Sequence, residues 1–319
     1  MTEVDRPFDV LTMGRVGVDL YPLQTGVTLA RVQTFQKSLG GSPTNVAVGA
    51  ARYGHRTAVI TKVGDDGFGT YVHEALRDFS VDDRYVGIDP ILRTPLAFCE
   101  LFPPDSFPIT FYRAPTAPDM HLSADELDLS SIRAARIFWT TGTGLSAEPS
   151  RSATLAALDT ARGIRVHDLD DRPTLWAEGE EPRLWAMEAV SRARVVVGNL
   201  DEVEMATATR DPARAAATLL AAGPEIVIVK QGLEGASAYT KDGVVHARGI
   251  PIEVVCGLGA GDAFGGALAH GLLAGWELGR ALAFANAAGA IVASRLACAD
   301  AMPTVAEVDA LLAASKHRA

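Results

Sequence analysis

Short apolar runs alternate with amphipathic or alanine-rich stretches along most of this 319-residue chain, and this alternation limits the possible folds more than any other feature. Strands that alternate with helices predict a mostly parallel α/β sheet covered on both faces. In such sheets the active site lies beyond the carboxyl ends of the strands. The strand candidates are Phe8–Met13, Thr57–Val63, Ala135–Thr140, Ile164–Leu169, Arg194–Gly198 and Glu225–Val229, and the helix candidates include Phe68–Asp78, Ser150–Arg162 and Pro212–Ala222.

Two segments, approximately 16–39 and 94–116, break this rhythm. The first holds β-like pieces but no helix, and the second reads as a hairpin of Leu96–Phe102 and Ile109–Arg113. We interpret them as one antiparallel flap at the edge of the sheet, which would exclude water from a reaction. The alternative is a small surface sheet without a gating role. A hairpin around Asp242-Gly243 predicts a plain extension of the main sheet. Since no linker or internal repeat is evident, we expect a single domain over residues 1–319.

Composition excludes several classes of partner. The net charge is −10 and no dense basic run occurs, which argues against nucleic acid or an anionic membrane. Cys99, Cys256 and Cys298 form neither a disulfide framework nor a Cys-x-x-Cys metal pair, as is typical of a reducing cytosol. The acidic N-terminus lacks a signal-peptide layout, and apolar stretches fall short of the ~20 residues of a membrane span. A cytoplasmic location is therefore expected.

The tetrapeptide Gly259-Ala260-Gly261-Asp262 leads into an alanine-rich helical stretch. Three small residues allow a tight turn whose amide N–H groups face an anion, helped by the helix dipole. A carboxylate there would repel a phosphate, so Asp262 makes sense as a base beside the group being transferred. The alternative is an ordinary helix N-cap. A dinucleotide fingerprint and a Walker loop are both missing, which leaves the parts of a small-molecule kinase.

A second motif is Gly40-Gly41-Ser42-Pro43-Thr44-Asn45. Ser42 suits an N-cap, Pro43 the first helical position and Gly54 the C-terminal cap, so a helix over Pro43–Tyr53 is predicted. The motif also fits a plain turn before a well-capped helix.

The same region offers candidate ligand contacts. The glycines up to Gly41 allow a ligand to approach the backbone closely, and Asn45 in the first helical turn can point at it. Asp19 follows the first strand by a few residues and can accept hydrogen bonds from sugar hydroxyls. Its alternative is a solvated turn residue.

Arg113 and Arg172 both end strand-like runs, so they are expected to face the site. An arginine matches a carboxylate with two parallel hydrogen bonds. Each charge-assisted bond contributes about 1.5–3 kcal/mol, so two such arginines favour a sugar acid over a neutral sugar. Either arginine could instead be a surface ion-pair partner.

Two further motifs follow predicted strands. Asn199 and Glu202 lie three residues apart and share a helix face, where they could organise a hydrated Mg²⁺. The same spacing is a capping box, and spacing does not separate the two. Lys230, Gly232 and Gly235 follow a buried strand and can border a nucleotide, although alone they describe only a turn.

Taken in order, these motifs are similar to those of the ribokinase-like (PfkB) carbohydrate kinases, from the first strand to Ala301-Met302-Pro303. The ordered set also includes Val63-Gly64-Asp65-Asp66-Gly67-Phe68-Gly69. The resemblance implies a ribokinase-like three-layer αβα sandwich with a mostly parallel central sheet and a small antiparallel β lid.

Within that family, Phe111-Tyr112-Arg113 and Asp171-Arg172-Pro173 resemble the keto-deoxy sugar-acid branch. Gly14-Arg15, Gly142–Ser146 and Asp300–Pro303 look most like kinases of inositol catabolism that use 5-dehydro-2-deoxygluconate. A 2-keto-3-deoxygluconate kinase is the alternative, followed by a fructokinase- or ribokinase-like enzyme and a non-catalytic sugar-acid sensor.

The resemblance implies ATP-dependent transfer to a terminal primary hydroxyl, with Asp262 taking the proton. The amides around Gly259, Ala260 and Gly261 would stabilise the transferring group, and Asn199 and Glu202 would hold Mg²⁺ through water. The implied nucleotide-binding residues are Asn199, Lys230, Gly232, Gly235 and Asn286, and the implied sugar-acid residues are Asp19, Gly41, Asn45, Arg113 and Arg172.

Two implications concern assembly and ions. A homodimer through the flap is expected, because it would bury an exposed β edge. Many family members carry Asp-Thr where this chain has Cys256-Gly257, and that Asp often helps form a monovalent-cation site. The resemblance therefore does not carry a standard K⁺ site over to this chain.

Overall fold

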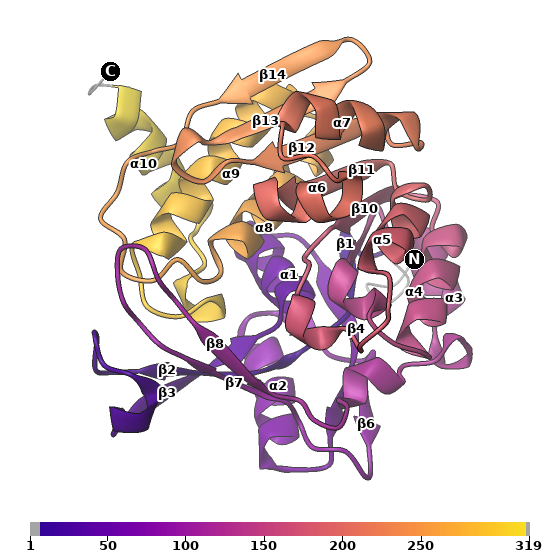
Figure 1. Cartoon of the computed structure of the whole chain (residues 1–319), viewed down its shortest axis with the longest axis vertical. Helices are drawn as coiled ribbons and strands as arrows, with labels where there is room; N and C mark the ends of the chain where they lie inside the picture. The colour runs from indigo at the N-terminus through magenta and orange to yellow at the C-terminus, as the bar shows by residue number, and fades with distance from the viewer. Residues whose placement is uncertain (1–6, 317–319) are drawn as a thin grey trace.

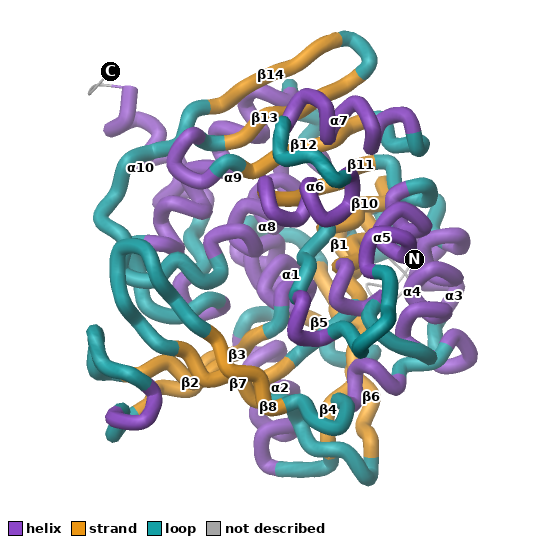
Figure 2. Tube along the Cα trace, in the orientation of Figure 1, coloured by secondary structure: helices purple, strands orange, loops and turns teal. Residues whose placement is uncertain are grey.

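The computed structural model describes residues 7–316 and is built on a ten-stranded sheet (Figures 1 and 2). The strand order is β14-β13-β12-β11-β10-β9-β1-β4-β5, with β6 paired to β4. All neighbours from β12 to β5 are parallel, and β13 and β14 add an antiparallel hairpin at one edge. The expected mostly parallel sheet and its hairpin extension are confirmed.

The strands match the predicted apolar runs to within a few residues. Strand β4 is buried along its whole length, as expected for a parallel strand covered on both faces. The bounds are β1 Val10–Met13, β4 Thr57–Gly64, β5 Val81–Asp82, β6 Val86–Asp89, β9 Ile137–Thr141, β10 Ile164–Asp168, β11 Val195–Asn199, β12 Ile226–Lys230, β13 Ala236–Thr240 and β14 Gly243–Ala247.

Helices cover both faces of the sheet and make three layers. Successive strand residues alternate between the faces: Val10 joins the core under α1, α8 and α9, whereas Leu11 joins the core under α3, α4 and α5. A third cluster packs α5, α6 and α7 on that second face. The helices are α1 Ser42–Arg52, α2 Gly67–Asp78, α3 Leu129–Ala134, α4 Ser150–Thr160, α5 Pro182–Val190, α6 Leu200–Thr207, α7 Pro212–Ala221, α8 Ala260–Leu273, α9 Leu278–Ala293 and α10 Val305–Lys316.

A separate four-stranded sheet contains both segments that break the βα rhythm. Its order is β3-β2-β7-β8, from β2 Gly17–Pro22, β3 Phe35–Gly40, β7 Leu96–Cys99 and β8 Ile109–Tyr112. The pairs β2–β3 and β7–β8 are antiparallel, as expected. Strands β2 and β7 come from two different hairpins, and they pair in parallel. The sheet projects from the edge of the main body (Figure 1). No helix within residues 7–316 is long and apolar enough to span a membrane.

Candidate active site at the carboxyl edge of the sheet

The N-terminus of α8 is an exposed set of main-chain donors. Gly259 precedes the helix with φ of 81°, and a Cβ atom there would lie 2.5 Å from Cys298 Sγ. Only glycine meets both conditions. Within residues 7–316 no side chain caps this end of α8, so the first-turn N–H groups and the helix dipole are available to an anion.

Asp262 lies in the first turn of α8 and is held by two side chains of α1. Its Oδ1 accepts a hydrogen bond from Ser42 Oγ at 2.7 Å, and its Oδ2 accepts one from Asn45 Nδ2 at 2.8 Å. Burial raises the pKa of Asp262, and the bonds from Asn45 and Ser42 oppose that rise. Asp262 is therefore an oriented carboxylate inside the helix, and the N-cap alternative is wrong because Gly259 holds that position.

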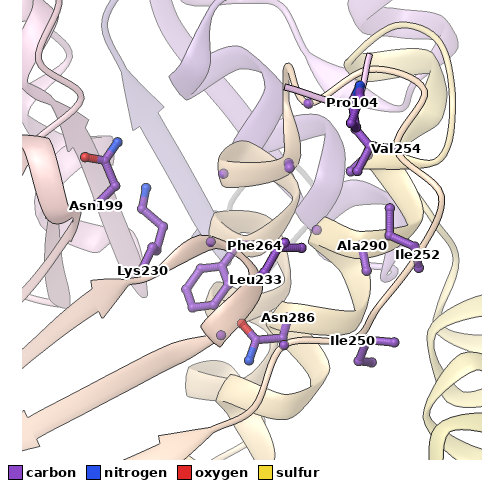
Figure 3. Close-up of a pocket in the computed structure, with 18 of the residues that line it drawn as sticks. Pro104, Asn199, Lys230, Leu233, Ile250, Ile252, Val254, Phe264, Asn286 and Ala290 are labelled. Carbon is purple, nitrogen blue, oxygen red and sulfur yellow. The ribbon is translucent and has the colours of Figure 1, made fainter. Parts of the chain in front are cut away.

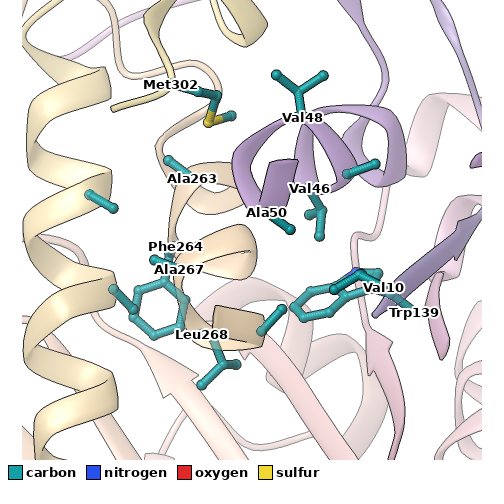
Figure 4. Packing of buried hydrophobic residues seen from close by; sticks show 14 of the residues in the cluster. Val10, Val46, Val48, Ala50, Trp139, Ala263, Phe264, Ala267, Leu268 and Met302 are labelled. Carbon is teal, nitrogen blue, oxygen red and sulfur yellow. The ribbon is translucent and has the colours of Figure 1, made fainter. Parts of the chain in front are cut away.

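Glycines explain why these side chains meet. A Cβ atom on Gly266 of α8 would lie 2.9 Å from the Cα of Gly49 in α1, so the two backbones touch. Val46, Ala50 and Ala263 pack beside this contact (Figure 4). The predicted helix is confirmed, but Ser42 is not its N-cap. Gly41 holds that position with φ of 104°, which leaves the Ser42 hydroxyl for Asp262.

The double glycine also makes room for Asp19 and Arg15. A Cβ atom on Gly40 would lie 2.2 Å from the Asp19 carboxylate, and one on Gly41 would lie 2.4 Å from the Arg15 carbonyl oxygen. Burial raises the pKa of Asp19 to about 6, opposed by the charge of Arg15 and a hydrogen bond from Tyr21. Two carboxylates and one arginine thus converge on this edge of the sheet.

The two arginines predicted to bind a carboxylate already have acidic partners. Arg113 donates to both oxygens of Asp119, at 2.7 and 3.2 Å, and both side chains are at least 90% buried. Arg172 lies 2.8 Å from Asp170, which raises the pKa of that guanidinium despite its burial. The Arg113 pair is buried, whereas the Arg172 side chain is 35% exposed, and the charges of both arginines are largely compensated within the protein.

A second charged cluster lies at the ends of β10, β11 and β12. Lys230 Nζ is 3.5 Å from Asp168 and 4.0 Å from Glu202. Burial acts to lower the pKa of Lys230, but these carboxylates raise it above its ordinary value. Burial raises the pKa of Asp168 to about 7 despite the lysine. Asn199 and Glu202 form a complete capping box at the start of α6, which is the alternative to a Mg²⁺ role that their spacing also predicted.

Beside α8 lies a cavity of about 990 Å³ (Figure 3). Its walls are mostly glycine and apolar side chains, and Pro103, Pro104 and Phe107 reach it from the β7–β8 loop. Ala260 and Gly261 of the α8 N-terminus also line it. The structure brings all five residues predicted to bind a nucleotide into this cavity: Asn199, Lys230, Gly232, Gly235 and Asn286.

Sequence reasoning missed Arg15, Asp168 and Asp170 as site residues and gave Ser42 the wrong role. Asp170 accepts a hydrogen bond from Thr143 Oγ1 at 3.3 Å and adopts φ of 27°, unusual for a residue with a side chain. All three missed residues end a parallel strand or lie two residues beyond its last residue. The rule that active sites lie beyond strand carboxyl ends could have identified them.

Cys256 occupies an apolar environment. It is fully buried and packs in a cluster with Tyr21, Cys99, Leu101 and Cys298. Burial raises the pKa of its thiol. A neutral thiol surrounded in this way is a poor ligand for a hard cation.

The arrangement can move a phosphoryl group: main-chain donors for its charge, a carboxylate to take a proton, and a large adjoining cavity. The model of the pfkB family carbohydrate kinases matches residues 8–305. A 5-dehydro-2-deoxygluconokinase of Listeria monocytogenes is 35% identical, with 97% of each chain covered.

Solved structures agree with this assignment. A putative ribokinase II of E. coli in complex with ATP and Mg²⁺ has a TM-score of 0.87 and 25% identity, covering 96% of this chain and 99% of that one. A Vibrio cholerae fructokinase with bound fructose, ADP and calcium has a TM-score of 0.85 and 28% identity, with the same coverage. The chain therefore belongs to the pfkB family of carbohydrate kinases.

Proposed function

We propose that this carbohydrate kinase transfers the γ-phosphoryl group of ATP to the terminal primary hydroxyl of 5-dehydro-2-deoxygluconate. One observation carries the proposal: the Asp262 carboxylate is fixed by Ser42 and Asn45 in the first turn of an uncapped helix, directly beside a large cavity. The names of the similar kinases support the substrate, and 2-keto-3-deoxygluconate is the alternative.

In the proposed reaction Asp262 accepts the hydroxyl proton of the sugar acid as the alcohol oxygen bonds to the γ-phosphorus. The bond from that phosphorus to the bridging oxygen of ATP breaks, and ADP leaves with the electron pair. The main-chain N–H groups of Gly259, Ala260 and Gly261 stabilise the charge on the transferring group. Because burial raises the pKa of Asp262, this carboxylate is a stronger base than an exposed one.

The cavity would hold ATP. Lys230 is fixed by Asp168 and would place its positive charge near the phosphates, while Gly232 and Gly235 let the nucleotide approach the backbone. Asn286 Nδ2 donates to the carbonyl oxygens of Ala247 and Arg248, which supports the cavity wall.

Mg²⁺ would enter with the ATP phosphates and supply charge neutralisation. Within residues 7–316 no group of three or more acidic, His or Cys side chains could hold the ion by itself. Glu202 is buried beside Lys230 and Arg172, so its carboxylate fits a role toward metal-bound water, shared with Asn199.

The sugar acid would lie on the other side of Asp262. Asp19 and the backbone at Gly41 would receive its hydroxyl groups, and Asn45 would contact it while holding the base. Asn45 Oδ1 has no hydrogen-bond partner within the described residues, so it has an unused acceptor close to the base. Arg113 and Arg172 would border the acid group.

The four-stranded sheet would act as a lid, in a single domain with the main sheet. Residues of the β7–β8 loop already line the nucleotide cavity, so movement of this loop would open or close it. The edge strand β8 carries Tyr112 with 60% of its surface exposed, and pairing through this sheet would make a homodimer. Sedimentation of the protein at several concentrations tests the dimer.

The deciding experiment couples ADP release to NADH oxidation with 5-dehydro-2-deoxygluconate, 2-keto-3-deoxygluconate and fructose side by side. We expect the highest kcat/KM with the first. A higher value with 2-keto-3-deoxygluconate or fructose would reassign the substrate within the family. Binding of a sugar acid with no ADP release from any of the three would favour a sensor.

A further inference from the structure

We infer that Arg15 is the specificity-determining residue that binds the carboxylate of the substrate. The inference rests on the proposed sugar-acid substrate and adds a residue to that site. Arg15 directly follows β1 and the intervening Gly14, at the carboxyl edge of the sheet.

Arg15 differs from Arg113 and Arg172 in the hydrogen bonding of its guanidinium. Within residues 7–316 its Nε is buried without a partner, and the nearest acidic oxygen, Asp170 Oδ2, is 3.8 Å away. Arg172 takes that carboxylate at 2.8 Å, and Arg113 is bonded twice to Asp119. Asp170 thus lies within hydrogen-bonding distance of Arg172, whereas it is only an ion-pair neighbour of Arg15.

The surroundings of Arg15 hold it in place for a ligand. Its guanidinium carbon lies 5.6 Å from the centre of the Phe111 ring in β8, and its backbone carbonyl accepts a hydrogen bond from Thr44 Oγ1 at 3.3 Å. Its charge is close enough to stabilise the ionised forms of both Asp19 and Asp262. Arg15 thus lies within electrostatic range of the base, and 12% of its side chain is exposed to receive a ligand.

The chemistry selects a carboxylate as that group. A buried guanidinium N–H without a hydrogen-bond partner is costly, and a planar anion satisfies a guanidinium with two parallel bonds. A neutral sugar offers only hydroxyl oxygens, which accept weaker hydrogen bonds from a guanidinium than a carboxylate does. The stack on Phe111 also links this contact to the small sheet, so the acid would be bound between the main body and β8.

The test compares 5-dehydro-2-deoxygluconate with its neutral primary amide as substrates for wild type and Arg15→Met. The ratio of kcat/KM for acid over amide should fall about 10- to 100-fold in the variant, the range for one charge-assisted hydrogen bond. Arg15→Lys keeps the charge but loses the planar fork, so it should keep part of the preference. Arg280→Met is the matched control, since Arg280 is exposed and stacks on Trp276 at 3.9 Å.

An unchanged acid preference in both Arg15 variants, with wild-type turnover of the acid retained, would overturn the inference and leave the proposed function standing. An equal loss in Arg280→Met would also overturn it. If wild type phosphorylates neither form, the proposed substrate fails and the inference with it. Should Arg15→Met not fold, as judged by thermal unfolding, the ratio in Arg15→Lys decides.

Discussion

The nucleotide side and the sugar side of Asp262 differ in the kinds of residues that line them. The nucleotide cavity is lined mainly by glycine and apolar side chains, with Lys230 among its few charged residues. The sugar side is crowded with buried charges that pair with one another, such as Arg113 with Asp119 and Arg172 with Asp170. The nucleotide cavity would therefore bind its ligand through its shape and its backbone groups, whereas the sugar side would bind through charged side chains that are already held in place by ion pairs.

This difference has an energetic consequence. Burying a charge costs several kcal/mol unless a partner compensates it, and on the sugar side burial raises the pKa of Asp19 to about 6 despite the charge of Arg15, so this carboxylate is incompletely compensated. The cavity walls are mainly glycine and apolar side chains, which need few compensating partners, and the cavity's Lys230 is paired with the buried Asp168. We therefore expect substitutions on the sugar side to alter turnover and the pH dependence of stability. Substitutions at the contact of α1 and α8 should act by moving the side chains that hold Asp262.

The largest effect is expected from Asp262→Asn, which removes the base where the two sides meet. Turnover should fall about 10²- to 10⁴-fold, because that is the typical contribution of a general base. ATP affinity, measured by calorimetry, should change little. Asp201→Asn is the control, since that carboxylate is 80% exposed on α6. Turnover near the wild-type value would remove Asp262 from the proposed chemistry.

Asp19→Asn tests how much the burial of this carboxylate lowers the stability of the folded protein. The pKa of Asp19 is raised to about 6 in the folded protein, so between about pH 4 and 6 the native state holds a proton that the unfolded state has released. The stability of wild type should therefore fall as pH rises through that window. The variant should lose up to about 2 kcal/mol of this pH dependence in urea unfolding at pH 4.5 and 7.

Asp242→Asn serves as its control because Asp242 is exposed in the β13–β14 turn. Identical pH dependence of stability in wild type and Asp19→Asn would show that burial of the Asp19 carboxylate does not destabilise the folded protein.

Gly266→Ala changes the contact between α1 and α8 without changing a charged residue, so it separates the effect of helix packing from that of buried charge. Its methyl group would lie 2.9 Å from the Gly49 Cα, so α1 and α8 must move apart. We expect a loss of about 1–3 kcal/mol in unfolding free energy, and a drop in kcat as Ser42 and Asn45 withdraw from Asp262. Gly67→Ala, where the added methyl meets nothing within 4 Å, should be neutral in both assays. An unchanged kcat in Gly266→Ala would separate helix packing from base positioning.

The sequence predicted the architecture well because local signals and tertiary structure agree. Apolar runs such as Thr57–Val63 became buried parallel strands, and the Asp242-Gly243 turn became the β13–β14 hairpin. The small sheet was also predictable, although the parallel pairing of β2 with β7 was not. That pairing joins segments far apart in the chain and leaves no local pattern.

The site was less predictable, because its side chains are defined by contacts across the fold. Ser42 has the signature of an N-cap, and only the close approach of α1 and α8 gives its hydroxyl to Asp262. Arg113 was singled out for its place at a strand end, but nothing local indicates that Asp119 would occupy it. Arg15 was noted only as part of the Gly14-Arg15 resemblance and Asp170 not at all, because their pairing depends on the neighbouring strands β1, β9 and β10.

The smallest effect is expected from the monovalent cation. Cys256 stands where the family often carries an aspartate, and it is buried among apolar side chains near the α8 N-terminus. A thiol offers a hard cation no charged oxygen, so replacing K⁺ by tetramethylammonium at constant ionic strength should change kcat by less than about two-fold, or ~0.4 kcal/mol. A much larger loss would mean that backbone carbonyls alone bind the ion, and that the nucleotide side also depends on a buried charge.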